Sequence, residues 1–198
     1  MIKVADTCFI RIPKTGSQAL LYFLQNNNLV EYCNNSIIHL NDGIATHQSN
    51  EQGHLTYNDI INIKPEYQHL HFIGVVRSPH EKLLSTYLYR HRQGRYKHSL
   101  SIEDFRLRIE YGGIDAELVH MLPQWKYFED CNRFTVWHYD TFETSLLQMF
   151  PDCKHPLKQV NHNSNSKQWV DKFYDKHTLD IVKQRYQRDY ELISHTYL

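Results

Sequence analysis

The feature that most constrains the fold of this chain is an apolar run, followed by a short loop and then by a second apolar run. Residues 7–12 (Thr-Cys-Phe-Ile-Arg-Ile) have the composition of a buried strand, and residues 18–24 (Gln-Ala-Leu-Leu-Tyr-Phe-Leu) have that of a helix. The loop between them, residues 13–17, reads Pro-Lys-Thr-Gly-Ser. The first N–H groups of a helix lack backbone partners and carry partial positive charge. A strand, a tight loop and a helix in this order therefore predict a site for a phosphate or a similar anion.

The side chains of this loop are of the kinds that an anion site uses. Lys14 adds a full positive charge, and Thr15 and Ser17 add hydroxyl donors. Gly16 lets the backbone approach the anion closely. Gln18, directly after the loop, is a further candidate for binding the ligand. These features predict a nucleotide or a similarly anionic cofactor.

The loop is nevertheless not a Walker A motif. That motif has a second glycine upstream and places its lysine and hydroxyl residue at the start of the helix, whereas Lys14 precedes the only glycine of this loop. Taken alone, the segment is equally well explained as a plain strand–turn–helix connection with an incidental lysine.

A second segment of the same kind begins at residue 70. Residues 70–76 (Leu-His-Phe-Ile-Gly-Val-Val) are apolar and predict another buried strand. Ser78 suits the N-cap of the next helix, Pro79 suits its first position, and Glu81 lies where a capping box has its acid. A helix over residues 79–91 is therefore expected. Its apolar side would carry Leu83, Leu84, Tyr87 and Leu88.

Arg77 and Ser85 are candidates for binding a phosphate beside this second strand. Ligands of open α/β sheets bind outside the carboxyl ends of the strands, and Arg77 directly follows such an end. The guanidinium fork can donate paired hydrogen bonds to phosphate oxygens. The alternative is that Arg77 forms a structural salt bridge and that Ser85 is a small residue for helix packing.

Together the two segments resemble the sulfotransferases that use 3′-phosphoadenosine 5′-phosphosulfate (PAPS), in particular the branch of the heparan sulfate O-sulfotransferases and their bacterial relatives. Residues 12–17, Ile-Pro-Lys-Thr-Gly-Ser, are similar to the family's loop for the 5′-phosphosulfate. Residues 75–79, Val-Val-Arg-Ser-Pro, together with Ser85, are similar to its element for the 3′-phosphate. Weaker similarity extends over Pro-Gln at 123–124, residues 134–143 and residues 186–192.

The resemblance also implies catalytic residues. Gly-His-Leu-Thr at residues 53–56 is similar to the family segment that supplies the catalytic base, which would be His54. A neutral histidine suits proton abstraction near neutral pH, and Lys14 suits neutralising the charge that develops on the leaving phosphate. His47 is the second candidate for the base, or it would orient the acceptor. Gln124 would contact the acceptor, and its alternative is a surface residue of a helix. The alternatives for His54 are a residue just before a helix that begins at Tyr57, or an exposed loop histidine.

Two further assignments follow from the same resemblance. Residues 161–167 are expected to form a lid over the 3′-phosphoadenosine, with Ser164 and Lys167 as the best matches, although their composition also fits a plain solvated loop. Arg11, on the strand before the first loop, is expected to face the sulfate. Its alternative is a strand residue that points to solvent.

Length, charge and composition limit the other possibilities. A chain of 198 residues suits one domain, and its equal numbers of acidic and basic residues, 22 each, argue against general nucleic-acid binding. No apolar stretch has the length of a signal peptide or membrane anchor, so a cytoplasmic enzyme of bacterial type, or a trimmed domain, is expected. The four cysteines form no CxxC, and most of the 14 histidines lack ligand spacing, so no metal and no disulfide are expected.

The remaining pattern alternates helices and strands. Helices are expected over 101–110, capped by Ser101, over 116–130 with a break at Pro123, and over 176–193, and a strand over 134–138. The chain is therefore predicted to be one α/β domain, with a P-loop-like three-layer fold in which helices flank a central, mostly parallel sheet.

The predicted function is sulfuryl transfer from PAPS to an acceptor hydroxyl, on a sugar or another glycan, by in-line displacement and without a metal, leaving 3′-phosphoadenosine 5′-phosphate (PAP). The first alternative is a small-molecule or nucleoside kinase that uses ATP and Mg²⁺, with Asp140 after the strand 134–138 as metal ligand. The second is a non-catalytic nucleotide- or carbohydrate-binding module. The sequence predicts neither the acceptor nor the oligomeric state.

Overall fold

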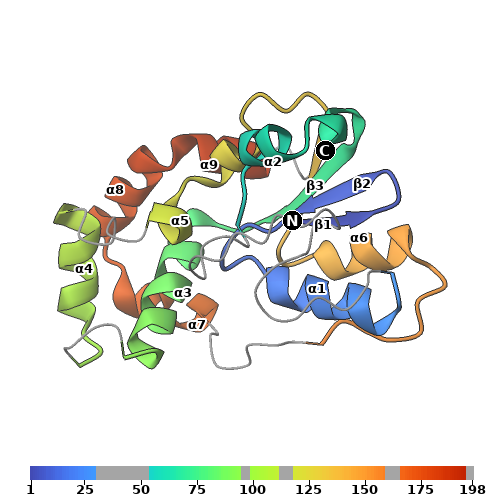
Figure 1. The fold of residues 1–198 in the computed structure, drawn as a ribbon. Helices are drawn as coiled ribbons and strands as arrows, with labels where there is room; N and C mark the ends of the chain where they lie inside the picture. Colours follow the sequence, from blue (N-terminus) through green and yellow to red (C-terminus); the bar gives the residue numbers. More distant parts are fainter. Residues whose placement is uncertain (30–53, 95–98, 112–117, 159–165, 195–198) are drawn as a thin grey trace. The chain divides into compact units, whose positions relative to one another are not determined.

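The computed structural model describes residues 1–29, 54–94, 99–111, 118–158 and 166–194. In these residues the chain is a mixed α/β protein with a four-stranded, mostly parallel sheet (Figure 1). The contacts divide it into two compact units. The first unit comprises residues 1–76 and 124–160, and the second comprises residues 77–123 and 161–198.

The sheet lies in the first unit and has the strand order β1-β2-β3-β4. The strands are β1 (Ile2–Val4), β2 (Thr7–Ile10), β3 (His71–Val76) and β4 (Phe134–His138). β1 pairs with β2 antiparallel, whereas β2–β3 and β3–β4 are parallel. The three strands predicted from the sequence are confirmed, and their carboxyl ends meet at one edge of the sheet. β1 was not predicted, because it has three residues and its turn uses Ala5 at φ 48°, which is not a typical residue for such a turn.

One face of the sheet is covered by α1 (Ser17–Asn26) and α6 (Phe142–Met149), which lie on the same side of the strands in Figure 1. Phe9, Ile73 and Val75 are buried there together with apolar side chains of both helices. These side chains alternate along the strands with residues that face the other way, as the pleat of a strand requires. The helix predicted over 18–24 is therefore confirmed, and it packs on the strand that precedes it.

The opposite face carries shorter helical segments. They are α2 (Tyr57–Ile63) and the 3-10 helix η2 (Gln124–Phe128), and the 3-10 helix η1 (Pro65–His69) joins α2 to β3. The ring of Tyr57 meets that of Phe72 edge to face, with 5.0 Å between the ring centroids. The sheet of the first unit thus has helical segments on both faces.

The second unit is helical. It contains α3 (Pro79–Arg92), α4 (Ile102–Tyr111), α5 (Leu118–Met121), α7 (Ser166–Phe173), α8 (Lys176–Arg185) and α9 (Gln187–Ser194). Its core centres on Tyr87 of α3, whose ring packs against those of Phe105 and Phe173. The helix expected at 79–91 and its apolar side are confirmed. So is the cap of α4, because the Ser101 hydroxyl accepts a hydrogen bond from the backbone N–H of Asp104 at 3.2 Å.

Two further predictions about helices have different outcomes. Pro123 separates α5 from η2, as its missing N–H leads one to expect. The single helix predicted over 176–193 is wrong, because the chain bends at Tyr186 and forms α8 and α9 instead. The Tyr186 side chain is buried, and its hydroxyl donates to the carbonyl of Met121 at 3.0 Å. A tertiary contact therefore overrides a continuous helical pattern.

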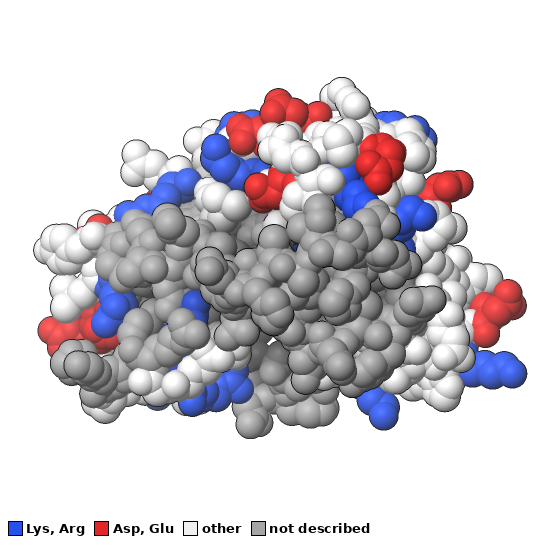
Figure 2. Space-filling view, viewed as in Figure 1, with Lys and Arg blue, Asp and Glu red and all other residues white. Residues whose placement is uncertain are grey.

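The described surface has no single-sign charge field in the view of Figure 2, where Lys and Arg side chains lie beside Asp and Glu side chains. None of the described helices has the length and apolar character needed to cross a membrane. Cys8, Cys131 and Cys153 are free thiols, and Cys33 lies outside the described residues.

We expect Gly74→Ala to destabilise the sheet. A Cβ at Gly74 would lie 2.5 Å from the ring of Phe128, which is buried and has little room to move. Overpacking of this kind costs about 1–3 kcal/mol, so urea unfolding should move to lower denaturant concentration.

The matched control is Gly94→Asn. Gly94 has φ +65° and nothing within 4 Å of its Cβ position, and Asn tolerates left-handed backbone. Its free energy of unfolding should change by less than about 1 kcal/mol. Equal unfolding midpoints for Gly74→Ala and the unmodified protein would contradict the packing described for this face.

Candidate functional site

The predicted anion loop leads into α1 without a side-chain cap. Gly16 is the N-cap residue at φ 86°, no side chain bonds the start of the helix, and the first helical backbone bond runs from Leu20 N–H to the Gly16 carbonyl. Lys14 is also left-handed, at φ 64°. Two residues of the loop, Lys14 and Gly16, therefore have left-handed backbone. The start of α1 carries partial positive charge that no side chain of the loop neutralises.

The loop side chains differ in what they do. Thr15 is fully buried, and its hydroxyl donates to the carbonyl of Ile12 at 2.9 Å, so it holds the loop in shape. Ser17 is buried, Lys14 is half-buried, and Gln18 is exposed. The hydroxyl proton of Thr15 is thus already engaged within the loop.

The surroundings of Gly16, as well as its backbone, disfavour a side chain at this position. A Cβ there would lie 3.2 Å from the ring of Tyr139 and 3.2 Å from that of Phe142. Tyr139 lies in the segment that joins β4 to α6, Phe142 is the first residue of α6, and their rings stack on each other. The loop after β2 and the segment after β4 are therefore packed together in the first unit.

Arg11 is a buried charged side chain whose hydrogen-bonding capacity is only partly used by the described residues. It is 9% exposed, burial lowers the pKa of its guanidinium, and its buried Nε has no hydrogen-bond partner. The structure also gives it no ion pair with any described acid. The alternative of a strand residue pointing to solvent is therefore wrong. A buried guanidinium without a counter-ion is unfavourable, and a bound anion would relieve it.

His54 is hydrogen-bonded to the backbone of Arg11. Its Nδ1 is 2.6 Å from the carbonyl oxygen of Arg11. Because a carbonyl only accepts, Nδ1 carries the proton, and Nε2 is then the acceptor atom of the neutral ring. The position of His54 is also fixed from the other side, since Thr56 and Asp59 form a capping box that begins α2 at Tyr57. His54 is half-buried, so it is not an exposed loop histidine.

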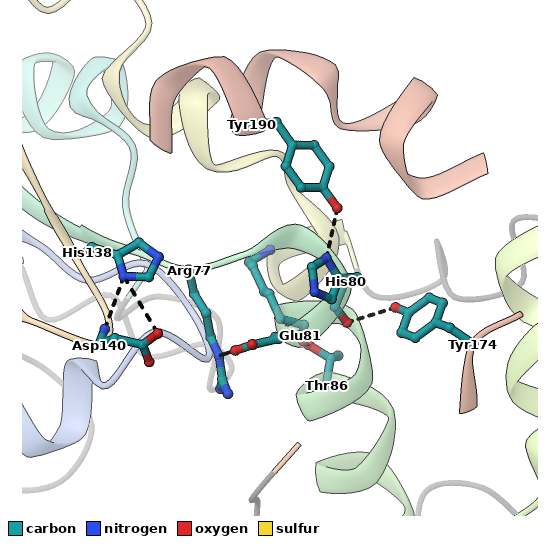
Figure 3. A network of polar contacts seen from close by, with 9 residues as sticks. Arg77, His80, Glu81, Thr86, His138, Asp140, Tyr174 and Tyr190 are labelled. Carbon is teal, nitrogen blue, oxygen red and sulfur yellow. Dashed lines mark hydrogen bonds and ion pairs between the residues drawn. The ribbon is translucent and has the colours of Figure 1, made fainter. Parts of the chain in front are cut away.

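Arg77 and Ser85 lie in the second unit and are both buried. The Nε of Arg77 donates to the carboxylate of Glu81 at 2.9 Å, as Figure 3 shows, so the salt bridge that the sequence left open is present. The predicted capping box is wrong, because Ser78 makes no side-chain cap bond. The charge-assisted bond to Arg77 takes the carboxylate that the box would have used.

The remaining predicted residues are only partly described. His47 and Ser164 lie outside the described residues; Lys167 lies in α7, but its side chain is not described. Gln124 begins η2 and is fully buried, so it is not a surface residue. Asp140 follows β4 and is 45% exposed, and its backbone N–H donates to Nδ1 of His138 at 3.3 Å.

The structure thus brings Arg11, the loop 13–17 and His54 together in the first unit, and it places Arg77 just before α3 and Ser85 within α3 in the second. The sequence did not predict the packing of Tyr139 and Phe142 on the loop. It did contain the signal for the Arg77–Glu81 pair, which is the i,i+4 spacing of opposite charges on a helix.

Comparisons with models of known protein families, with curated proteins and with solved structures found no match to this chain.

We expect Arg11→Met to stabilise the protein when no anion is bound. Methionine fills a similar volume and removes a buried charge that has no counter-ion in the described part of the chain, so the free energy of unfolding should rise by about 1–4 kcal/mol. The measurement is urea unfolding without added anions. Lys82→Met, which removes the donor to two backbone carbonyls, serves as the contrasting variant and should destabilise. A loss of stability in Arg11→Met would show that Arg11 is a structural residue.

Proposed function

We propose that this protein is a PAPS-dependent sulfotransferase that transfers the sulfuryl group to a hydroxyl of a sugar or another glycan. The observation that supports this most is the pairing of Arg11 and His54. The guanidinium of Arg11 is buried without a counter-ion among the described residues, and the backbone carbonyl of Arg11 holds His54 in one tautomer. Arg11 lies shortly before the uncapped start of α1. An anionic donor and a proton acceptor are what transfer to an alcohol requires.

Each residue has a definite role in the proposed reaction. His54 Nε2 takes the proton of the acceptor hydroxyl while the acceptor oxygen forms a bond to sulfur and the bond from sulfur to the 5′-phosphate oxygen breaks. Lys14, Arg11 and the start of α1 stabilise the charge on the sulfuryl group and on the leaving phosphate. The bond of Nδ1 to the Arg11 carbonyl keeps the ring in the tautomer that accepts at Nε2. Arg77 and Ser85 bind the 3′-phosphate.

A kinase remains the second candidate because of Asp140. Its half-exposed carboxylate follows β4, whose carboxyl end lies at the same sheet edge as that of β2. Such a carboxylate is typical of a Mg²⁺ site in enzymes that use ATP. A kinase would require ATP and Mg²⁺, which the titration below compares directly with PAP.

We expect the protein to bind PAP more tightly than adenosine 5′-phosphate, because only PAP has the 3′-phosphate that Arg77 would bind. Isothermal titration should show a difference of about 100-fold, the effect of a charge-assisted contact of about 3 kcal/mol. Arg77→Ala should reduce that difference and leave the affinity for adenosine 5′-phosphate unchanged. Equal affinities in the unmodified protein, with tight binding of ATP and Mg²⁺, would favour the kinase.

His54→Asn separates the catalytic role of His54 from a structural one. The asparagine amide can donate to the Arg11 carbonyl as Nδ1 does, but it cannot accept a proton. Turnover with PAPS should fall by about 10²-fold or more, while PAP binding and thermal stability stay as they are. His177→Ala, at a side chain that is 68% exposed, is the control and should retain full activity. Near-normal turnover in His54→Asn would show that another group is the base.

A further inference from the structure

The first turn of α3 is held by contacts from distant parts of the second unit. The hydroxyl of Tyr190, in α9, is hydrogen-bonded to Nδ1 of His80 at 2.9 Å, and the two rings stack (Figure 3). Tyr174, at the end of α7, donates its hydroxyl to the backbone carbonyl of His80 at 2.8 Å. Both the side chain and the backbone of His80 are therefore fixed by tyrosines that are far away in the sequence.

Lys82 is fixed just as firmly, two residues further on. It is 1% exposed, and its Nζ donates to the carbonyls of His120 and Leu122 at 2.8 and 3.0 Å. These carbonyls end α5 or follow it, where a cation is favourable. The backbone on both sides of Glu81 is thus anchored, so the position of its carboxylate is set by the fold.

Glu81 uses this fixed position to bind Arg77 and not to cap the helix. The contact joins Glu81 Oε2 to Arg77 Nε at 2.9 Å, and the two side chains are only 11% and 6% exposed. Nε carries one of the five N–H donors of the planar guanidinium, and the two Nη atoms carry the other four, which can form paired bonds to a phosphate. A carboxylate on Nε fixes the plane of the group and therefore the direction of its other donors.

We propose that Glu81 is a positioning residue for the 3′-phosphate, acting through the Nε of Arg77, an inference that rests on the proposed function. The length of the Glu81 side chain and its negative charge have opposite effects on phosphate binding by Arg77. The length of the side chain holds the guanidinium in the orientation that accepts a phosphate, whereas its negative charge opposes the bound anion. Selectivity for a 3′-phosphorylated nucleotide therefore depends on the presence of an acceptor atom at this distance, and not on the carboxylate charge.

The test measures the ratio of the dissociation constants for adenosine 5′-phosphate and PAP. Glu81→Gln keeps an oxygen that can accept from Nε at the same distance, so the ratio should be retained or rise. Glu81→Ala removes the acceptor and Glu81→Asp shortens its reach, so in both the ratio should fall by about tenfold, the effect of one misplaced charge-assisted contact. If Glu81→Ala does not fold, the test rests on the ratios of Glu81→Asp and Glu81→Gln, and only the ratio of Glu81→Asp should fall.

Asp104→Ala is the matched control. Asp104 accepts from Nε of Arg108 at 2.8 Å on α4, the same kind of i,i+4 pair, and it should lower stability without changing the ratio. An unchanged ratio in Glu81→Ala would overturn the proposal. A rise in PAP affinity in both Glu81→Ala and Glu81→Gln would overturn it too, since only the charge would then matter. If the unmodified protein binds adenosine 5′-phosphate and PAP equally well, the proposed donor is wrong. The proposed role of Glu81 is then wrong as well.

Discussion

The parallel pairing of β2, β3 and β4 is the constraint on which the candidate site of the first unit depends. Its register sets Ile10 opposite Gly74 and Val76 opposite His138, so the three strands end along one edge. The loop after β2 and the segment after β4 therefore leave the sheet at the same end, on either side of β3, and they pack together at Gly16. Their packing disfavours a side chain at Gly16. Ligands of open α/β sheets bind at such an edge because several loops and helix starts converge there.

The two arginines at these strand ends illustrate two ways to accommodate a buried charge. Arg77 is paired with Glu81 in the second unit, so its charge is balanced within the chain. Arg11 has no such partner among the described residues, and burial lowers the pKa of its guanidinium. A buried ion pair roughly balances its desolvation, whereas an isolated buried ion does not. The contrast assigns the greater need for an external anion to Arg11, where the proposed sulfuryl group would bind.

The sequence predicted those elements whose signals are local. Apolar runs located β2, β3 and β4, and a proline located the end of α5. Contacts between residues far apart could not be predicted in this way. The bend at Tyr186 depends on a bond to Met121, 65 residues away, and the tautomer of His54 depends on the carbonyl of Arg11, 43 residues away. The same rule holds beside the predicted site, where the sequence placed Glu81 in a local cap and the structure pairs it with Arg77.

Several local departures from favourable geometry coincide with the segments that the sequence singled out. Lys14 adopts a left-handed backbone that suits glycine or asparagine better, Arg11 buries a charge, and Ser78 begins α3 without a side-chain cap. Each departure is locally unfavourable by about 1 kcal/mol or more. Natural sequences usually agree with their fold at every level, and the exceptions concentrate where a function requires them. Because Lys14 and Arg11 lie in and directly before the loop that leads into α1, these two departures support the anion site proposed above.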